Sequence, residues 1–171
     1  MLGGARSGKS SFAEGLLARE RDVEYVACGL VPDGSDAEWA DRVQLHRRRR
    51  PSSWRTVETV DLPAVLGRPG PPVLVDCLTT WLARVMDECG IWAEAPEADA
   101  RLADAVERLV AAWTATRRRV VAVSNEVGSG VVPATPSGRR FRDELGVLNA
   151  RVAAASPRVW LVTAGLPQRL R

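Results

Sequence analysis

Cysteine is scarce in this sequence, and the few cysteines present form no recognisable pattern. Cys28, Cys77 and Cys89 are odd in number and lack the close spacing of metal ligands, so neither a disulfide framework nor a zinc site is predicted. Long apolar runs are also missing, since segments such as VVAV and VLV are short. No membrane-spanning helix and no secretory leader is therefore expected. These absences predict a soluble, cytoplasmic protein with reduced thiols.

Lysine and histidine each occur once, as Lys9 and His46. Arginine therefore supplies nearly all of the 24 basic residues, which almost balance 21 acidic residues and leave a net charge of +3. So small a net charge says little about partners. Because arginine is common along the whole chain, a scattered arginine carries little functional weight. Lys9 carries more, because it persists where the composition would favour arginine.

The apolar segments that are present alternate between two periodicities. Four short runs rich in β-branched residues predict strands at 23–27, 72–76, 119–124 and 158–163, and helical spacing predicts helices over 102–113 and 141–155. Strands that are apolar throughout, separated by amphipathic helices, favour an α/β fold with a mostly parallel sheet and helices on both faces. With no repeat or linker, residues 1–171 are expected to form a single domain.

The segment GGARSGKS matches the phosphate-binding pattern G-x-x-x-x-G-K-[ST]. Gly3 and Gly8 allow the backbone to wrap around phosphates, and Lys9 supplies a compact charge for the β- and γ-phosphates. Ser10 supplies a Mg²⁺ ligand, and the following helix adds the donors of its N-terminus. A glycine-rich chain can match this pattern by chance. Here the motif opens an amphipathic segment and contains the only lysine, which favours a P-loop NTPase-like nucleotide site.

A phosphate loop ordinarily follows a β-strand, but only Met1 and Leu2 precede Gly3. Either the first strand is very short, or the protein begins upstream of Met1. We expect the second, because a phosphate loop without its strand would leave a gap in the middle of the sheet. The first strand is accordingly predicted to be truncated in this sequence.

A second motif, VLVDC, places Asp76 at the end of a predicted buried strand. In P-loop enzymes a carboxylate at this point reaches the Mg²⁺ of the bound nucleotide. The alternative is an aspartate that only caps the following segment, LTTWLARVM. The phosphate loop earlier in the chain favours the metal or nucleotide role for Asp76.

Several segments, taken in order, resemble one enzyme family. They are GGARSGKS, YVA, RVQLHRRRRPSSWRTVE, VLVDCLTTWL, VSNEVGSGVVP, RRFRDELGVLN and VWLVTAGLP. Over nearly its whole length the chain resembles the bifunctional adenosylcobinamide kinase / adenosylcobinamide-phosphate guanylyltransferases of cobalamin synthesis. The phosphate loop alone would be generic. The histidine segment and SNEVGSGVVP are much more specific.

The resemblance implies a mostly parallel P-loop fold, often a homotrimer, with two activities. With Mg²⁺, a nucleoside triphosphate such as ATP or GTP would phosphorylate the aminopropanol hydroxyl of adenosylcobinamide. GTP would then transfer GMP to a histidine, with release of pyrophosphate, and the enzyme would pass GMP to the phosphorylated corrinoid. The family's nucleophile falls on His46, and Lys9 of the phosphate loop is expected to be the second catalytic residue. Its nucleotide-contacting positions fall on Gly3, Gly4, Ala5, Arg6, Ser7, Gly8, Lys9, Ser10, Ala27, Cys28, Gly29, Arg47, Arg48, Arg49, Arg50, Glu58 and Asp76.

The segment LHRRRR has a composition that suits this chemistry. We expect a helix from near position 35 to Pro51. It would place Arg42, His46 and Arg49 on one face. A neutral imidazole is a good nucleophile toward phosphorus, and guanidiniums can hold the phosphates and the pyrophosphate leaving group. The neighbouring positive charges also favour the unprotonated imidazole. A core or capping histidine and part of an RNA-binding patch are the alternatives.

The segment Ser124–Pro133 follows a predicted strand, so it is expected at the carboxyl edge of the sheet, where open α/β folds bind ligands. Its glycines suit a loop that closes on a substrate, and a tight strand-to-helix connection is the alternative. No catalytic residue is assigned to it. Arg139, Arg140 and Arg142 are interpreted as a solvated face rather than a second phosphate contact.

Two other functions agree with parts of the sequence. One is a P-loop kinase with a single activity on another small molecule, in which the histidine is only structural. The other is a nucleotide-regulated RNA-binding module built on the segments RRRR and RRR, against which the small net charge and few aromatic residues argue. The predicted partners are therefore a small-molecule corrinoid and nucleotides, without a nucleic acid or a membrane.

Overall fold

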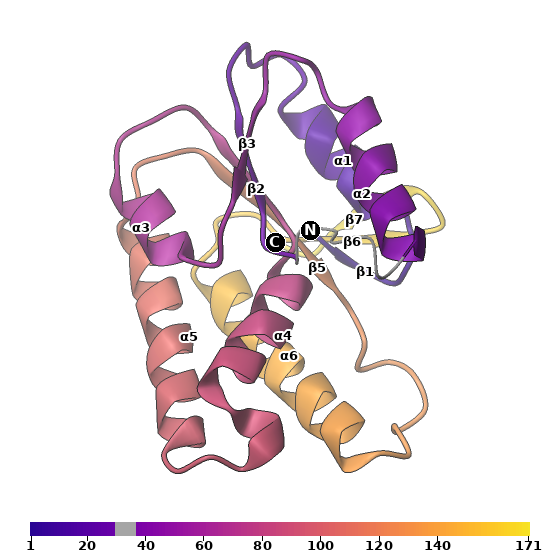
Figure 1. Cartoon of the computed structure of the whole chain (residues 1–171). Coiled ribbons are helices and arrows are strands. Elements are labelled where there is room, and N and C mark those ends of the chain that lie inside the picture. Colours follow the sequence, from indigo (N-terminus) through magenta and orange to yellow (C-terminus); the bar gives the residue numbers. More distant parts are fainter. Residues whose placement is uncertain (30–36) are drawn as a thin grey trace.

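The computed structural model describes residues 1–29 and 37–171, apart from the side chains at positions 38, 39, 42, 46 and 49. Within this part of the chain, one sheet of seven strands is surrounded by six α-helices and one 3₁₀ turn (Figure 1). The strands are β1 (Leu2–Gly3), β2 (Glu24–Ala27), β3 (Arg55–Glu58), β4 (Val73–Asp76), β5 (Val120–Asn125), β6 (Trp160–Thr163) and β7 (Leu166–Arg169). The helices are α1 (Lys9–Leu16), α2 (Ala37–Arg49), α3 (Leu62–Gly67), α4 (Leu78–Cys89), α5 (Ala98–Ala115) and α6 (Pro136–Ala154), with the 3₁₀ turn η1 (Ile91–Ala93).

The sheet has the strand order β3-β2-β4-β5-β1-β6-β7. Every neighbouring pair is parallel except β6 and β7, which are antiparallel. The carboxyl ends of the parallel strands therefore meet at one edge of the sheet, and open α/β folds bind their ligands at such an edge. This topology confirms the predicted α/β fold with a mostly parallel sheet and is consistent with a P-loop NTPase-like domain.

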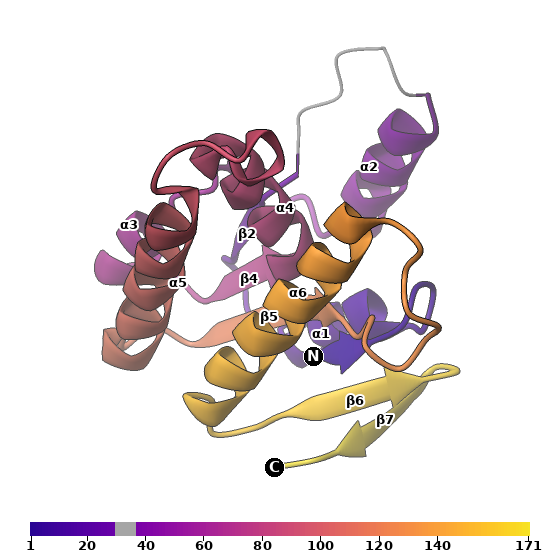
Figure 2. The ribbon, with the colours of Figure 1, turned by 90° about the horizontal axis from the view of Figure 1, so that it is seen from below.

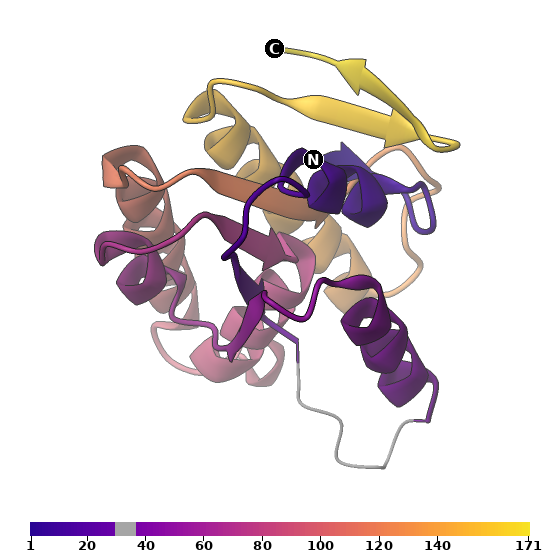
Figure 3. The same ribbon diagram turned by 90° about the horizontal axis from the view of Figure 1, so that it is seen from above.

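Helices cover both faces of the sheet, as predicted. On one face α4, α5 and α6 pack over the strands (Figure 2), and on the other lies α1 (Figure 3). Ala13 of α1 and Leu17, which directly follows it, are buried there. Alternate side chains of β4 enter the two layers, since Val73 and Val75 belong to the first and Leu74 to the second. A strand that is buried on both sides has no polar face, which explains the continuous apolar runs of the sequence.

The first strand is short but present, contrary to the expected gap in the sheet. β1 lies between β5 and β6 and is parallel to both; its two residues pair with β5, and Leu2 also pairs with β6. Leu2 is opposite Ser124 and Leu161, and Gly3 is opposite Asn125. Because a neighbour on each side supplies hydrogen-bond partners, the ladder continues up to the phosphate loop.

Two strands were not predicted from the sequence, β3 and β7. All four residues of β7 are exposed, and β3 has one half-buried residue among exposed ones, so neither shows an apolar pattern. They lie at the two ends of the sheet, where one side of the strand needs no partner. β7 returns from β6 through a two-residue turn in which Ala164 and Gly165 have φ values of 50° and 81°, as a type I′ hairpin requires.

Candidate functional site

The phosphate loop joins β1 to α1 through a tight turn over residues 4–8. Gly3 approaches β6 so closely that a Cβ atom would lie 2.5 Å from the carbonyl oxygen of Val162. Gly8 has a φ of +91°, in the left-handed region that favours glycine. Arg6 also has a left-handed φ of 55°, a strained conformation for a side-chain-bearing residue that is typical of functional loops. The two glycines of the motif are thus required for different reasons. Gly3 allows the loop to approach β6 closely, and Gly8 allows a left-handed backbone conformation.

Lys9 begins α1 with a side chain that is only 8% exposed. Its Nζ donates a hydrogen bond to the carbonyl oxygen of Gly4 at 2.9 Å, so the ammonium group folds back over the loop. The N-terminus of α1 directs backbone N–H groups and the positive end of the helix dipole toward the same space. Ser10 follows in the first turn of this helix. A charged donor above a ring of backbone donors is suited to a polyphosphate.

Two neighbouring elements hold the phosphate loop in place. On one side the hairpin turn between β6 and β7 lies against it, and the N–H of Gly165 donates to the carbonyl oxygen of Ser7 at 2.8 Å. On the other side the N–H of Glu126, just after β5, donates to the carbonyl oxygen of Gly3 at 3.0 Å. The segment Ser124–Pro133 therefore starts beside the phosphate loop, which agrees with its predicted place at the carboxyl edge.

A buried polar network fixes the end of β5. The hydroxyl of Ser124 donates to Oδ1 of Asn149 at 2.6 Å, and Nδ2 of Asn149 donates to the carbonyl oxygen of Asn125 at 3.0 Å. The N–H of Asn125 donates to Oγ1 of Thr79 at 2.8 Å. Because buried polar groups are costly without partners, such a network permits one position of the strand end. Sequence reasoning assigned no role to Asn149; its signal is a polar residue four places after Leu145 on an otherwise apolar helix face.

Asp76 ends β4, and β5 lies between β4 and the strand of the phosphate loop. Neighbouring strands are about 4.8 Å apart, so the ends of β4 and β1 are separated by about 10 Å along the sheet edge. The carboxylate of Asp76 accepts a hydrogen bond from the hydroxyl of Tyr25, with 2.7 Å between Oη and Oδ2. Its place at the carboxyl edge is the one that the predicted metal role requires.

Tyr25 is a site residue that sequence reasoning missed. Its side chain is only 3% exposed and belongs to the apolar layer under α1. Burial, and next the negative charge of Asp76, raise the pKa of Tyr25 above its ordinary value, so the hydroxyl keeps its proton and donates a hydrogen bond to the carboxylate. The available signal was weak: Tyr25 is the only tyrosine of the chain.

Arg47 and Arg50, the first and the last of the four consecutive arginines, contact β3. Nη2 of Arg47 donates to Oε1 of Glu58 at 2.8 Å, in an ion pair whose two side chains are both partly exposed. Nη1 of Arg50 donates to Oγ1 of Thr56 at 3.0 Å. The guanidinium of Arg50 also lies over the ring of Tyr25, with Cζ 3.5 Å from the ring centroid. The structure therefore brings together Arg47 with Glu58, and Arg50 with the Tyr25–Asp76 pair.

The helix predicted around the single histidine is α2, which spans Ala37–Arg49 and ends before Pro51. His46 lies in its last turns, beside the arginine that bonds to the end of β3. The expected start near position 35 and the side chains of Arg42, His46 and Arg49 lie outside the described part of the structure. The face that these three side chains were predicted to share stays a prediction.

The predicted segment Ala27–Gly29 lies at the same edge. Ala27 is opposite Glu58 on one side and Asp76 on the other. The side chain of Cys28 is fully buried, and burial raises the pKa of its thiol. A nucleotide at this edge would meet backbone atoms of Cys28 rather than its sulfur. The three cysteines of the chain are free thiols.

Four further predicted contacts are exposed. Gly4, Ala5 and Arg6 form the exposed tip of the phosphate loop, and Arg48 is exposed on α2. These positions are open to a ligand from solvent.

The arginines near the start of α6 contact protein groups. Nη1 of Arg139 donates to the carbonyl oxygens of Pro133 and Ala134 at 3.0 and 2.8 Å. Arg140 pairs with Asp99 at 2.7 Å and with Glu144 at 2.9 Å. These contacts tie the loop after β5 to the first turn of α6 and connect α6 to α5. The two side chains thus lie at the surface, Arg139 exposed and Arg140 partly exposed, and both bond to neighbouring protein groups. Their interpretation as a solvated face stays a prediction.

The donor atoms at this edge fit Mg²⁺. The hydroxyl of Ser10 and the carboxylate of Asp76 are hard oxygen ligands, and Mg²⁺ in nucleotide enzymes usually takes one or two of these together with phosphates and waters. Among the side chains that the structure describes, no group of three or more histidine, cysteine, aspartate or glutamate residues could hold a metal. The hydroxyl of Ser10 and the carboxylate of Asp76 fit the protein ligands of such a Mg²⁺–nucleotide complex.

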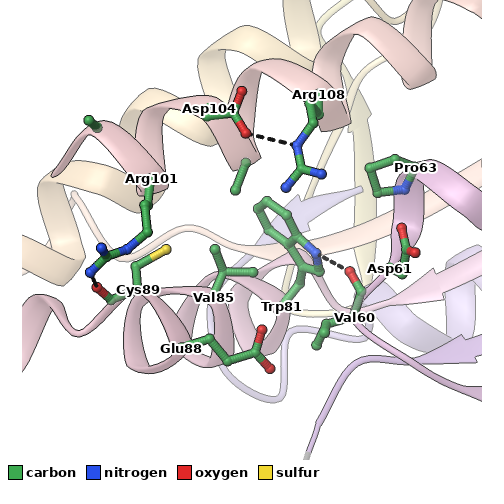
Figure 4. A pocket seen from close by; sticks show the side chains of 12 residues that line it. Val60, Asp61, Pro63, Trp81, Val85, Glu88, Cys89, Arg101, Asp104 and Arg108 are labelled. Atoms are coloured by element: carbon green, nitrogen blue, oxygen red, sulfur yellow. Dashed lines mark hydrogen bonds and ion pairs between the residues drawn. The ribbon is translucent and has the colours of Figure 1, made fainter. Parts of the chain in front are cut away.

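A separate depression of about 670 Å³ lies between the loop after β3, α4 and α5. Trp81 forms part of its wall, and the indole N–H donates to the carbonyl oxygen of Val60 at 2.8 Å (Figure 4). Arg108 and Asp104 form an ion pair at its rim. None of the predicted site residues lines this depression.

In the described ranges, no helix combines the length and the apolar character needed to cross a membrane.

Comparisons with known proteins cover the whole chain. A family described as "Cobinamide kinase / cobinamide phosphate guanyltransferase" matches residues 1–170. The bifunctional adenosylcobalamin biosynthesis protein CobU of Escherichia coli (strain K12) is 36% identical over 180 residues, which cover 100% of this chain and 98% of that protein. CobU of Salmonella typhimurium is 36% identical over 185 residues, with the same coverage. The bifunctional adenosylcobalamin biosynthesis protein CobP of Pseudomonas aeruginosa is 40% identical over 176 residues, covering 100% of this chain and 95% of CobP.

Proposed function

Because the chain belongs to the cobinamide kinase / cobinamide phosphate guanyltransferase family, we propose that neighbouring parts of one sheet edge perform its two reactions. The protein is a bifunctional cobinamide kinase and guanyltransferase of cobalamin biosynthesis. In the first proposed reaction, ATP or GTP phosphorylates the aminopropanol hydroxyl of adenosylcobinamide. In the second, GMP passes from GTP through a guanylyl-histidine at His46 to adenosylcobinamide phosphate, which gives adenosylcobinamide-GDP.

The kinase reaction takes place at the phosphate loop in this proposal. Lys9 and the N-terminus of α1 bind the β- and γ-phosphates and stabilise the charge that shifts toward the bridging oxygen. Ser10 and Asp76 would hold Mg²⁺, which when bound supplies charge neutralisation and orients the phosphates. The substrate hydroxyl oxygen bonds to the γ-phosphorus while the bond from that phosphorus to the bridging oxygen breaks. A nucleoside diphosphate leaves, and the hydroxyl proton is released.

The guanylyl transfer belongs to α2. A neutral ring nitrogen of His46 bonds to the α-phosphorus of GTP, the bond to the α–β bridging oxygen breaks, and pyrophosphate leaves. An oxygen of the corrinoid phosphate then bonds to the same phosphorus, and the imidazole is released. Arg47 and Arg50 are held by Glu58, Thr56 and Tyr25. Guanidiniums in defined positions beside the histidine are suited to the charge of the leaving pyrophosphate.

The contact of Arg50 with Tyr25 and, through it, Asp76 is the observation that carries this proposal. Arg50 directly follows α2, so its contact over the Tyr25 ring docks the histidine-bearing helix beside the carboxylate expected at the kinase site. A histidine that only caps a helix or fills the core would have no reason to lie on a helix beside the sheet edge that carries the phosphate loop. The arrangement therefore supports two phosphate chemistries at one edge.

The histidine assignment is tested by covalent labelling. The wild-type protein is incubated with α-³²P-GTP and Mg²⁺ and then separated under denaturing conditions. We expect a covalent label that is lost in acid and stable in base, as for a phosphoramidate. His46→Ala should give no label and no transfer of GMP to adenosylcobinamide phosphate, because the chain has no second histidine.

The matched variant is His46→Asn, which keeps a polar side chain without a nucleophilic ring nitrogen. It should behave like the alanine variant in the labelling assay, whereas both should retain at least part of the kinase activity. Persistent radiolabelled GMP on the alanine variant would reject His46 as the nucleophile.

The single-activity kinase is separated from this proposal by the same assay. Such an enzyme would phosphorylate its substrate without ever becoming labelled by α-³²P-GTP. The RNA-binding module would show neither reaction, and its RNA affinity would fall steeply as salt is raised.

We also propose that the protein is a homotrimer. The support in the structure is apolar surface: Val131 is 95% exposed in the loop after β5, and Leu166 is 74% exposed on the edge strand β7. Exposed apolar groups on an edge strand favour association. Light scattering after size exclusion should give three times the chain mass of 18.5 kDa. A monomer mass at assay concentrations would contradict this.

A further inference from the structure

Tyr25 lies between two groups of the proposed site that come from distant parts of the chain. In the parallel pairing of β2 and β4, Tyr25 is opposite Leu74 and Ala27 is opposite Asp76. Tyr25 is therefore diagonal to Asp76 on the same face of the sheet. Its hydroxyl uses this placement to donate to Oδ2 of Asp76 at 2.7 Å.

The hydroxyl of Tyr25 is not needed for packing, because the ring of a phenylalanine would fill the same space. The ring lies in an apolar layer with Ala13, Leu17 and Leu74, and the whole side chain is almost completely buried. A buried hydroxyl is unfavourable unless it finds a partner. This hydroxyl donates to the carboxylate of Asp76, so orienting that carboxylate is what the hydroxyl adds to the site.

The ring of Tyr25 makes a second contact, on its face. The guanidinium of Arg50 lies 3.5 Å from the ring centroid, an arrangement favoured by the negative face of the π-system. Arg50 also interacts electrostatically with Asp76 and with Glu14 of α1. The carboxylate is thus oriented by a hydrogen bond and stabilised by a positive charge, and Tyr25 positions both.

We infer that Tyr25 is a positioning residue of the kinase site, whose hydroxyl orients the Asp76 carboxylate toward the divalent cation of the bound nucleotide. This inference rests on the metal role of Asp76 in the proposed function. Removing a group that orients a metal ligand through a hydrogen bond commonly lowers metal affinity or activity by about 10–100-fold. The effect should fall on the cation and on turnover, while the corrinoid contacts stay unchanged.

The test uses Mn²⁺ as the probe and the variant Tyr25→Phe. This variant keeps the aromatic ring and therefore its contact with the guanidinium of Arg50. Mn²⁺ is titrated into protein saturated with a non-hydrolysable GTP analogue, and free Mn²⁺ is measured by electron paramagnetic resonance. We expect the dissociation constant for Mn²⁺ to rise by about tenfold or more. The Mg²⁺ concentration for half-maximal kinase rate should rise in parallel, with the KM for the corrinoid unchanged.

Thr116→Val is the matched control, because it also removes one hydroxyl. Oγ1 of Thr116 donates to the carbonyl oxygen of Leu66 at 2.8 Å, at the opposite edge of the sheet. This variant should bind Mn²⁺ as the wild type does. Melting temperatures of both variants, measured without nucleotide, show whether the fold is retained.

A third variant, Asp76→Asn, separates failure of this inference from failure of the proposed function. If Asp76→Asn loses Mn²⁺ affinity and Tyr25→Phe stays within twofold of the wild type, Tyr25 is not a positioning residue. If Asp76→Asn also binds Mn²⁺ normally, the metal role of Asp76 and this inference are both overturned. In the double variant, Tyr25→Phe should have no further effect, because its hydroxyl acts only through the carboxylate.

Discussion

The chain contains one lysine, one histidine and one tyrosine, and these rare residues gather near the same sheet edge. Lys9 lies over the phosphate loop, and Tyr25 bonds to the aspartate that ends β4. His46 lies in α2, next to the arginine that bonds to the end of β3. In a chain where arginine supplies almost every positive charge, a retained lysine indicates a need for a compact ammonium group.

Lys9→Ala should abolish nucleotide binding at the phosphate loop while leaving the fold intact. Nζ donates to a carbonyl oxygen of the phosphate loop, and the side chain is largely buried beside that loop, so we expect its removal chiefly to take away the charge that binds phosphate. We expect kinase turnover to fall by at least about 100-fold, with a nearly unchanged melting temperature. Lys9→Arg is the matched control and should also be impaired, since a planar guanidinium cannot replace the ammonium group. Normal turnover in folded Lys9→Ala would remove the phosphate loop from the mechanism.

At the scale of elements, the phosphate loop depends on its neighbours. Its backbone bonds to the β6–β7 turn through Gly165 and to the residue after β5 through Glu126. The loop is therefore positioned by two strands that lie more than 100 residues further along the chain. The glycines of the loop differ in the space around them. A Cβ atom at Gly3 would meet the carbonyl oxygen of Val162, whereas a Cβ atom at Gly4 would meet no atom within 4 Å.

Gly3→Ala and Gly4→Ala form a matched pair within one loop. The first places a methyl group 2.5 Å from a backbone oxygen of β6, which cannot rotate away. We expect Gly3→Ala to lower the free energy of unfolding by about 1–3 kcal/mol through overpacking. Gly4→Ala should change it by less than about 0.5 kcal/mol, since the added methyl group points into open space. Urea denaturation measures both values, and equal losses would contradict the role assigned to the β6 contact.

At the scale of the whole molecule, a second charged cluster lies at the opposite, amino edge of the sheet. Glu24 is 2% exposed, and its carboxylate accepts from Arg118 at 2.8 Å, from Arg68 at 3.1 Å and also from Arg55. These arginines come from three separate segments that enter β5, β4 and β3. The cluster joins the amino ends of four strands and lies far from the nucleotide edge. Its role is therefore stability rather than chemistry.

The stability of the protein should decline in acid because of Glu24. Burial alone would raise the pKa of this carboxyl, but the hydrogen bonds and charges of Arg118, Arg55 and Arg68 outweigh it and hold the pKa below the ordinary value of 4.5. A depressed pKa in the folded state contributes stability that is present above the unfolded value and is lost as the pH falls through the folded one. The free energy of unfolding should thus decrease progressively below about pH 4.5.

Glu24→Gln checks this assignment. It leaves Arg118 buried beside an uncharged partner, so the free energy of unfolding at pH 7 should fall by about 3–5 kcal/mol. Its decline in acid should also be shallower than that of the wild type. The control is Glu20→Gln at the exposed Arg119–Glu20 pair, which should cost less than about 1 kcal/mol. Parallel acid profiles for the wild type and Glu24→Gln would reject Glu24 as the titrating group.

The sequence by itself determined the features whose signals are local. Four of the seven strands lie where the apolar runs predicted them, because a strand buried on both faces must be apolar throughout. The phosphate loop, the carboxylate at the end of β4 and the helix around His46 were also predicted, since each depends on a short motif. Strands without an apolar face, such as β7, carried no such signal.

The tertiary structure decided the features that depend on pairing between distant strands. The Tyr25–Asp76 bond follows from the register of β2 on β4, and the support of the phosphate loop by Gly165 follows from the position of β6 beside β1. Likewise, two residues suffice for β1 only because β5 and β6 lie on either side of it. Strand order and register result from the packing of the whole sheet, and no stretch of sequence contains them alone.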